Sequence, residues 1–175
     1  MRARLFLLGA VFAVAQMGMC RAADNPSLEY AVKAAYLTKF IPFITWPNGA
    51  LPQANTPVTI CVMGDDPFGG KLEQAAAGAK LGEHPVTVKK AAAPDAACQI
   101  AFLGTGADAS LESWRGKPVV TVTDSGARAH GVISFVLVDN HVRFDIDDAL
   151  AAQDGLQVSS KLLSLAHIVK PRGAP

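Results

Sequence analysis

Residues that could do chemistry are scattered along this 175-residue chain rather than gathered in motifs. The histidines lack the HxH or HExxH spacing with which proteins present zinc ligands. Ser159-Ser160 lacks the GxSxG turn that exposes a nucleophilic serine. We therefore predict no catalytic residue, no metal site and no cofactor site, and we do not expect an enzyme. The four histidines are His84, His130, His141 and His167.

Acidic residues are densest at Asp145, Asp147 and Asp148. Asp145 and Asp147 would share one face of a strand that reached that far, which leaves a divalent-cation or acid–base role open. The alternative is that these acids begin a helix and line a solvated edge, because carboxylates stabilise the first turn of a helix. We favour the second interpretation.

A glycine-rich turn, Gly64-Asp-Asp-Pro-Phe-Gly-Gly70, follows an apolar stretch and precedes a short helical pattern. That order is typical of phosphate-binding turns, which hold the anion at a helix N-terminus. The Walker A motif would need glycine at Asp65 and a hydroxyl residue at Leu72. Two acids in the turn would also repel a phosphate. We therefore interpret this segment as a tight turn.

The N-terminus has the pattern of a secretory signal peptide. Arg2 and Arg4 precede an apolar run over 5–17, and small residues at 22–23 suit cleavage. The apolar run is too short to span a membrane. We predict that residues 1–22 are removed and that residues 23–175 form one soluble domain in the periplasm. Removal lowers Lys plus Arg from 16 to 13 against 15 acids, so we expect no nucleic-acid partner.

Cysteine use then becomes simple, because Cys20 leaves with the signal peptide. Cys61 and Cys98 remain. In an oxidising compartment an even pair of cysteines favours a disulfide. The alternative is two reduced cysteines, each buried in a strand as a small apolar residue.

The longest apolar-periodic stretch outside the signal peptide runs from Leu28 to Pro47. Apolar residues recur in it at helical spacing, and Pro42 predicts that the helix ends or kinks at about Ile41. Strands are predicted near 58–63, 86–88, 99–103 and 119–123, and a hairpin over 133–146. Short helices are predicted over 71–77, 111–114 and 147–152, and a last amphipathic helix over 160–169.

Strands and helices alternate up to about residue 123, which predicts a mostly parallel sheet. The hairpin adds an antiparallel pair near the C-terminus. The expected fold class is therefore α/β, a single-domain sandwich with a mixed, mostly parallel sheet flanked by helices.

Four segments resemble the YfiR family of periplasmic regulators. They are EYAVKAAYLTKFIPFITWP from Glu29, ICVMGDDPFGGKLEQ from Ile60, CQIAFLG from Cys98 and the run GVISFVLVDNHVRFDIDDALAAQDGLQVSSKLLSLAHIV from Gly131. Together they cover almost the whole chain after the signal peptide. Cys61 stands where the family often has a cysteine. The second, C-terminal cysteine pair of better-known members is absent, and with it any redox switching through that bridge.

The resemblance implies a binding protein rather than an enzyme. Characterised members restrain an inner-membrane diguanylate cyclase by binding its periplasmic region, which lowers cyclic-di-GMP and biofilm formation. An outer-membrane, peptidoglycan-associated lipoprotein can relieve this inhibition by sequestering the repressor. We expect the same partners for this chain, and we leave open whether it also forms a homodimer.

Partner contacts are predicted at Lys33, Lys39, Phe43 and Trp46, because one helix cannot bury every aromatic residue of the 28–47 stretch on one face and aromatic residues are enriched at interfaces. The alternative is that the exit segment carries them all into the core. A competing function is a small-ligand sensor that uses the carboxyl ends of the parallel strands, at 64–70 and 104–107.

Overall fold

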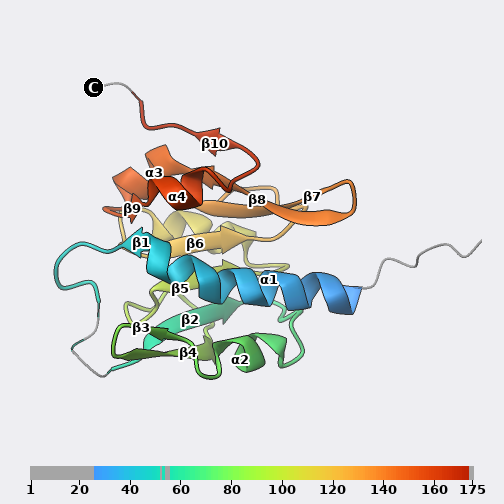
Figure 1. Cartoon of the computed structure of the whole chain (residues 1–175), viewed down its shortest axis with the longest axis horizontal. Coiled ribbons are helices and arrows are strands. Elements are labelled where there is room, and N and C mark those ends of the chain that lie inside the picture. The colour runs from blue at the N-terminus through green and yellow to red at the C-terminus, as the bar shows by residue number, and fades with distance from the viewer. Residues whose placement is uncertain (1–25, 52, 54–55, 174–175) are drawn as a thin grey trace, which may run out of the picture.

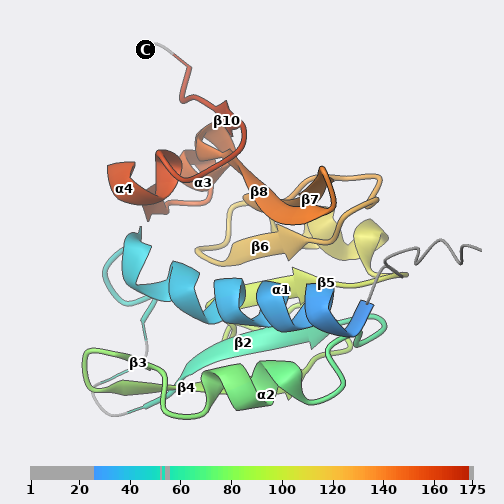
Figure 2. The same ribbon diagram turned by 45° about the vertical axis from the view of Figure 1, so that its right-hand side comes forward.

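Helices and strands alternate along the chain in the computed structural model, which describes residues 26–51, 53 and 56–173. The predicted signal peptide lies outside the described residues. Figure 1 shows the elements, and Figure 2 shows them turned by 45°. In chain order they are α1 (Pro26–Phe40), η1 (Ile41–Phe43), β1 (Ile44–Thr45), β2 (Val58–Met63), α2 (Lys71–Ala76), β3 (Lys80–Leu81), β4 (His84–Lys90), β5 (Ile100–Leu103), η2 (Asp108–Trp114), β6 (Val120–Thr123), β7 (Ile133–Val138), β8 (His141–Asp147), α3 (Asp148–Gln153), β9 (Gln157–Val158), α4 (Ser160–Leu163) and β10 (Val169–Lys170).

One mixed sheet of eight strands, in the order β10-β8-β7-β6-β5-β2-β4-β3, forms the centre of the described chain. The strands β4, β2, β5, β6 and β7 run parallel to one another. The strands β7 and β8 form an antiparallel hairpin. The predicted α/β class, with a mostly parallel sheet, flanking helices and a hairpin near the C-terminus, is confirmed.

The two faces of the sheet bury different cores because side chains alternate along each strand. In β2, Ile60 and Val62 join the core beneath α1 and α2, whereas Cys61 and Met63 join a second core with Leu111 and Trp114 of η2. Strands buried on both faces read as continuous apolar runs, as parallel strands do. Figures 1 and 2 show α1 and α2 side by side on one face.

The β7–β8 hairpin, predicted over 133–146, turns through Asp139 and Asn140. Both have positive φ, 48° and 60°, as the two central residues of a type I′ turn require. Asparagine and aspartate tolerate this left-handed conformation better than other residues with a Cβ. The register pairs Phe135 with Phe144 and Leu137 with Val142.

The last predicted helix, over 160–169, is wrong beyond its first turn. The helix α4 ends at Leu163, and the chain then becomes β10, which pairs in parallel with β8. His167 N–H donates to the Phe144 carbonyl, and Ile146 N–H donates to the Ile168 carbonyl, at 2.8 and 2.9 Å. The unpaired edge of β8 captures this segment, because strand-edge backbone groups require partners.

The exit from α1 follows the prediction made from Pro42. The helix ends at Phe40, and one 3₁₀ turn with Pro42 at its second position carries the chain into β1. The strand β1 pairs antiparallel with β9, which joins Ile44 to Val158. This small second sheet fixes the end of α1 against the segment that leads into α4.

Candidate partner-binding site

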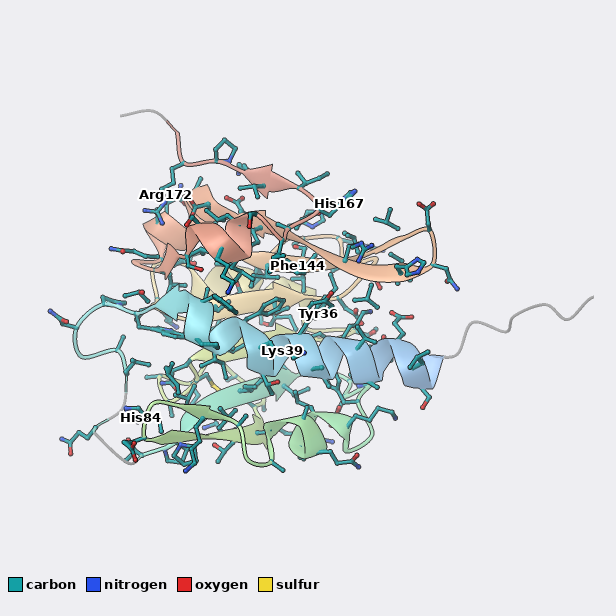
Figure 3. All side chains as sticks on the ribbon, viewed as in Figure 1. Tyr36, Lys39, His84, Phe144, His167 and Arg172 are labelled. Carbon is teal, nitrogen blue, oxygen red and sulfur yellow. A yellow bond between two sulfur atoms is a disulfide. The ribbon has the colours of Figure 1, made fainter. Side chains whose placement is uncertain are left out.

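The inner face of α1 packs on the β7–β8 hairpin through an aromatic cluster. Tyr36 and Phe40 lie one helical turn apart, and their rings stack at 5.8 Å. Phe144 meets both rings edge-on, at 5.4 and 5.0 Å, and Phe135 completes the cluster. Figure 3 shows Tyr36 and Phe144 between the helix and the hairpin. Edge-on and stacked pairs add about 0.5–1.5 kcal/mol each to area burial.

A buried ion cluster anchors the N-terminal half of α1. The Lys33 side chain is completely buried, and its ammonium donates to the carboxylates of Glu29 and Asp124 and to the Ser125 hydroxyl. The Tyr30 hydroxyl donates to the other oxygen of Asp124 at 2.8 Å. Burial and then this bond to Asp124 raise the pKa of Tyr30 above its ordinary value. The cluster joins α1 to the loop that follows β6.

The four residues predicted at a partner surface differ in how far they are exposed to solvent. Lys33 and Trp46 are buried, at 0% and 6% exposure, so neither presents its side chain to a partner in this structure. Lys39 is exposed in the last turn of α1, and Phe43 is half-buried in η1. The role of all four residues in binding stays a prediction. Of the four, Lys39 and Phe43 have side chains that a partner could contact.

Phe43 has a basic neighbour that the sequence did not indicate. The ammonium of Lys161, from α4, lies 5.7 Å from the centre of the Phe43 ring. Phe43 and α4 are held together because Ser159 N–H donates to the Phe43 carbonyl at 2.9 Å, while the Ser159 hydroxyl accepts the Leu162 N–H and caps α4. We call Lys39, Phe43 and Lys161 the exit surface.

The predicted Cys61–Cys98 disulfide is confirmed, with the two Cα atoms 5.7 Å apart. It joins β2 to the segment just before the neighbouring β5. Both cysteines are buried, at 0% and 1% exposure, in the core shared with Trp114. The bridge therefore stabilises the sheet from within and presents no sulfur to solvent.

The sequence matches the YfiR/HmsC-like family (DUF4154) over residues 30–167, which span α1 through α4. The chain belongs to the YfiR/HmsC-like family. Membership suggests a periplasmic regulator of cyclic-di-GMP signalling, and the family is regulatory rather than a known enzyme family. Among curated proteins, none matches the chain.

The strand ends proposed for a small ligand are filled by the chain of this YfiR-like domain itself. Asp65 N–H donates to the Thr105 carbonyl at 3.2 Å, which joins the loops after β2 and β5. A Cβ on Gly64 would stand 2.5 Å from the Thr105 carbonyl oxygen, and one on Gly104 would stand 2.2 Å from that of Asp65. These glycines allow two backbones to touch where an open α/β sheet often holds its ligand.

The acidic cluster serves the C-terminal segment. Asp145 accepts from the His167 ring and the Ile168 N–H, and Asp147 pairs with Lys170 at 2.8 Å while it caps α3. The Asp148 carboxylate accepts hydrogen bonds from both Nε and Nη2 of Arg172. The capping interpretation agrees with the structure. Within the described ranges, no group of three or more His, Cys, Asp or Glu could hold a metal ion, and no helix is long and apolar enough to cross a membrane.

The Lys33–Asp124 and Lys161–Phe43 contacts could not be predicted from the sequence. The Glu29–Lys33 pair has i,i+4 spacing and could have been found. Asp124 lies 91 positions from Lys33, and nothing local shows that the two meet. Lys161 and Phe43 are likewise brought together by the β1–β9 pairing and the Ser159–Phe43 hydrogen bond, which join segments distant in the sequence.

Proposed function

We propose that this chain is a periplasmic protein that binds the periplasmic region of an inner-membrane diguanylate cyclase and restrains it, which lowers cyclic-di-GMP and biofilm formation. The observation that carries the proposal is the family match over residues 30–167. The N-terminal signal pattern supports export, and the described residues form no metal cluster. An outer-membrane, peptidoglycan-associated lipoprotein is a second proposed partner, one that relieves the restraint.

We assign the cyclase contact to the exit surface. Phe43 offers an aromatic ring that is half-buried and already held in place by the β1–β9 pairing. Aromatic residues with fixed conformations are the usual anchors of protein interfaces. Lys161 adds positive charge beside the ring, and Lys39 is a second exposed lysine four positions earlier in the chain, so the complementary segment should be apolar with acidic neighbours.

The first experiment is deletion of the gene and measurement of cellular cyclic-di-GMP. We expect the level to rise, and plasmid-borne wild type to lower it again. Plasmid-borne Phe43→Ala and Lys161→Glu variants should lower cyclic-di-GMP less than the wild type does. Lys80→Glu is the matched charge control, because Lys80 is an exposed lysine on β3. An unchanged cyclic-di-GMP level in the deletion strain would refute the proposal.

The second experiment is affinity capture from solubilised membranes with the tagged wild type and the same variants. We expect a protein with a diguanylate cyclase output domain to be captured by the wild type and by Lys80→Glu. Truncating a central aromatic anchor should weaken capture about 30-fold. Equal capture by Phe43→Ala and by the wild type would place the contact elsewhere.

A further inference from the structure

The segment that runs from α4 into β10 exposes two large apolar side chains. Leu165 and Ile168 are 60% and 56% exposed. The inward positions of the same segment are already filled, because Leu162 is buried and the partly buried Leu163 and Ala166 pack against the core beneath α1. Leu165 and Ile168 are therefore apolar residues that the core does not use. Large apolar side chains gathered at one exposed place mark a contact with a protein or a membrane.

The backbone holds both side chains in place. Leu165 N–H donates to the Leu162 carbonyl at 3.1 Å. Ile168 N–H donates to the Asp145 carboxylate at 3.0 Å, and the Ile168 carbonyl accepts the Ile146 N–H at 2.9 Å. A partner that contacts the two side chains therefore finds the backbone already ordered, and such preorganisation lowers the cost of binding.

Basic residues lie on both sides of these two side chains in the sequence. The stretch 155–173 contains Lys161, Lys170 and Arg172 and has no aspartate or glutamate. Figure 1 shows β10 as the outermost strand on its side of the sheet, and Figure 3 shows His167 and Arg172 on that side of the molecule. We call Leu165, Ile168 and the three Lys and Arg residues the C-terminal edge.

The acids near the C-terminal edge are less exposed than the bases that pair with them. The side chains of Lys170 and Arg172 are 70% and 44% exposed, whereas those of their partners Asp147 and Asp148 are 21% and 11% exposed. Lys161 is exposed and forms no ion pair within the described residues. The outermost charges of this edge are therefore cations. Because salt screens charges over a short distance, the outermost groups dominate the attraction to an anionic surface.

We propose that the C-terminal edge binds the surface of an anionic lipid bilayer. Leucine and isoleucine side chains can enter the boundary between lipid headgroups and acyl chains, while lysine and arginine beside them attract anionic headgroups. A protein partner fits this edge less well, because aromatic residues anchor many protein interfaces and leucine is under-represented among their strongest contacts. The stretch 155–173 has no Phe, Trp or Tyr.

The lipid contact does not depend on the cyclase proposal, because a bilayer of pure lipid contains no cyclase. The two contacts are nevertheless compatible. Lys161 of the exit surface lies in α4, directly before the segment that carries Leu165. A chain attached to the inner membrane by its C-terminal edge would hold the exit surface close to the bilayer, where the periplasmic region of a membrane protein begins. Two aliphatic side chains and a few bases give weak and reversible attachment.

The test is flotation of the protein, purified from the periplasm, with vesicles of phosphatidylethanolamine and phosphatidylglycerol. We expect the wild type to float with these vesicles at low salt. The bound fraction should fall as salt rises, or as neutral phosphatidylcholine replaces phosphatidylglycerol. Leu165→Ser and Ile168→Ser should each lower the partition coefficient about tenfold or more, because each removes an apolar side chain that would leave water. Leu28→Ser, at a 65% exposed leucine of α1, is the matched control and should bind as the wild type does.

Urea titration of each variant reports whether it folds as the wild type does. If Ile168→Ser loosens β10, Leu165→Ser decides the test, because Leu165 lies outside every strand. A wild type that does not float with the anionic vesicles overturns the inference, and so does equal binding to vesicles of phosphatidylcholine alone. Equal losses for Leu28→Ser and Leu165→Ser overturn the assignment to the C-terminal edge. If the wild type binds no vesicles and Leu165→Ser loses cyclase capture, the edge contacts a protein and the lipid inference is wrong.

Discussion

Lys33 illustrates how a single buried charge positions the helix on which the proposed function depends. Its ammonium is enclosed by Glu29, Asp124 and the Tyr30 ring, 4.7 Å from the ring centre. Replacement by Met would retain much of the volume but leave two carboxylates without their cation. Removing one partner of a buried ion pair costs about 3 kcal/mol or more. We expect Lys33→Met to lower the free energy of unfolding by about that amount, measured by urea titration.

The matched control for that substitution is Lys39→Met on the same helix. Lys39 is exposed, so its removal should change the free energy of unfolding by less than about 0.5 kcal/mol. Equal effects of the two substitutions would mean that the buried cluster contributes no more than an exposed lysine does.

Asp154 gives the stability of the protein a pH dependence. One carboxylate oxygen accepts the Gly116 N–H at 2.7 Å, and the other is buried without a partner among the described residues. Burial raises the pKa of Asp154 despite the Gly116 bond and the nearby Arg115. A raised pKa means that the folded state holds this proton more tightly than the unfolded state. The stabilisation is therefore complete below about pH 4 and is lost as pH rises through the raised pKa.

Asp154→Asn tests this pH dependence, because the amide oxygen can still accept the Gly116 N–H while no charge is buried. We expect the variant to equal or exceed the wild type in free energy of unfolding at pH 7. Its advantage should shrink as pH falls toward 4, followed by urea titration at several pH values. A difference that stays constant with pH would show that Asp154 is not the group responsible.

Among the elements, those with a local signal could be predicted from the sequence and those with a distant cause could not. The strand β2 and the hairpin over 133–146 agree with the prediction because apolar runs and turn residues are local properties. The two-residue strands β1, β3, β9 and β10 are too short to show any periodicity. The segment after Leu163 has helical spacing, yet it pairs with β8 because that edge offers backbone groups that need partners.

Arg172 holds this last strand in place from outside the sheet. Its guanidinium donates to both oxygens of Asp148, at 2.9 and 3.1 Å, and so joins the end of the chain to the first turn of α3. We expect Arg172→Ala to loosen the attachment of β10 to α3, since a bidentate charged pair is lost at a partly exposed site. Hydrogen exchange should become faster at His167 and Ile146, whose N–H groups bond across the β8–β10 edge.

Arg115→Ala provides the comparison for the Arg172 prediction. Arg115 pairs with the exposed Glu112 at 3.6 Å, a contact that solvent weakens. It should leave exchange at the β8–β10 edge unchanged. Faster exchange in both variants would indicate a general loss of stability rather than release of β10.

At the scale of the whole molecule, the two faces of the sheet have different roles. The face under α1 and α2 carries the helix whose end is exposed for the proposed cyclase contact, whereas the face under η2 encloses the disulfide. The disulfide could be predicted from the expected export and the even number of remaining cysteines, without knowledge of the fold. The sequence does not show that Lys33 and Trp46 are buried while Lys39 is exposed. Their burial depends on contacts with Asp124, β7 and β9, which are distant in the sequence.

The disulfide shows what this arrangement means for redox control. The two cysteines are 37 positions apart, and closing a loop of that size stabilises the fold by about 4 kcal/mol in the chain-entropy model. Both sulfur atoms are enclosed by the second core, so a reductant can reach them only when that core opens.

We expect tris(2-carboxyethyl)phosphine to reduce the bridge slowly in native buffer. The reduction rate should rise with urea in proportion to the unfolded population, as followed by thiol labelling and mass spectrometry. The Cys61→Ala/Cys98→Ala variant should unfold at lower urea by an amount that matches the lost stabilisation. Reduction at the same rate in native buffer and in urea would mean that the bridge is reachable in the folded protein. If the rates differ as expected, any redox signal through these cysteines must act on the unfolded or newly exported chain, and not on the folded regulator.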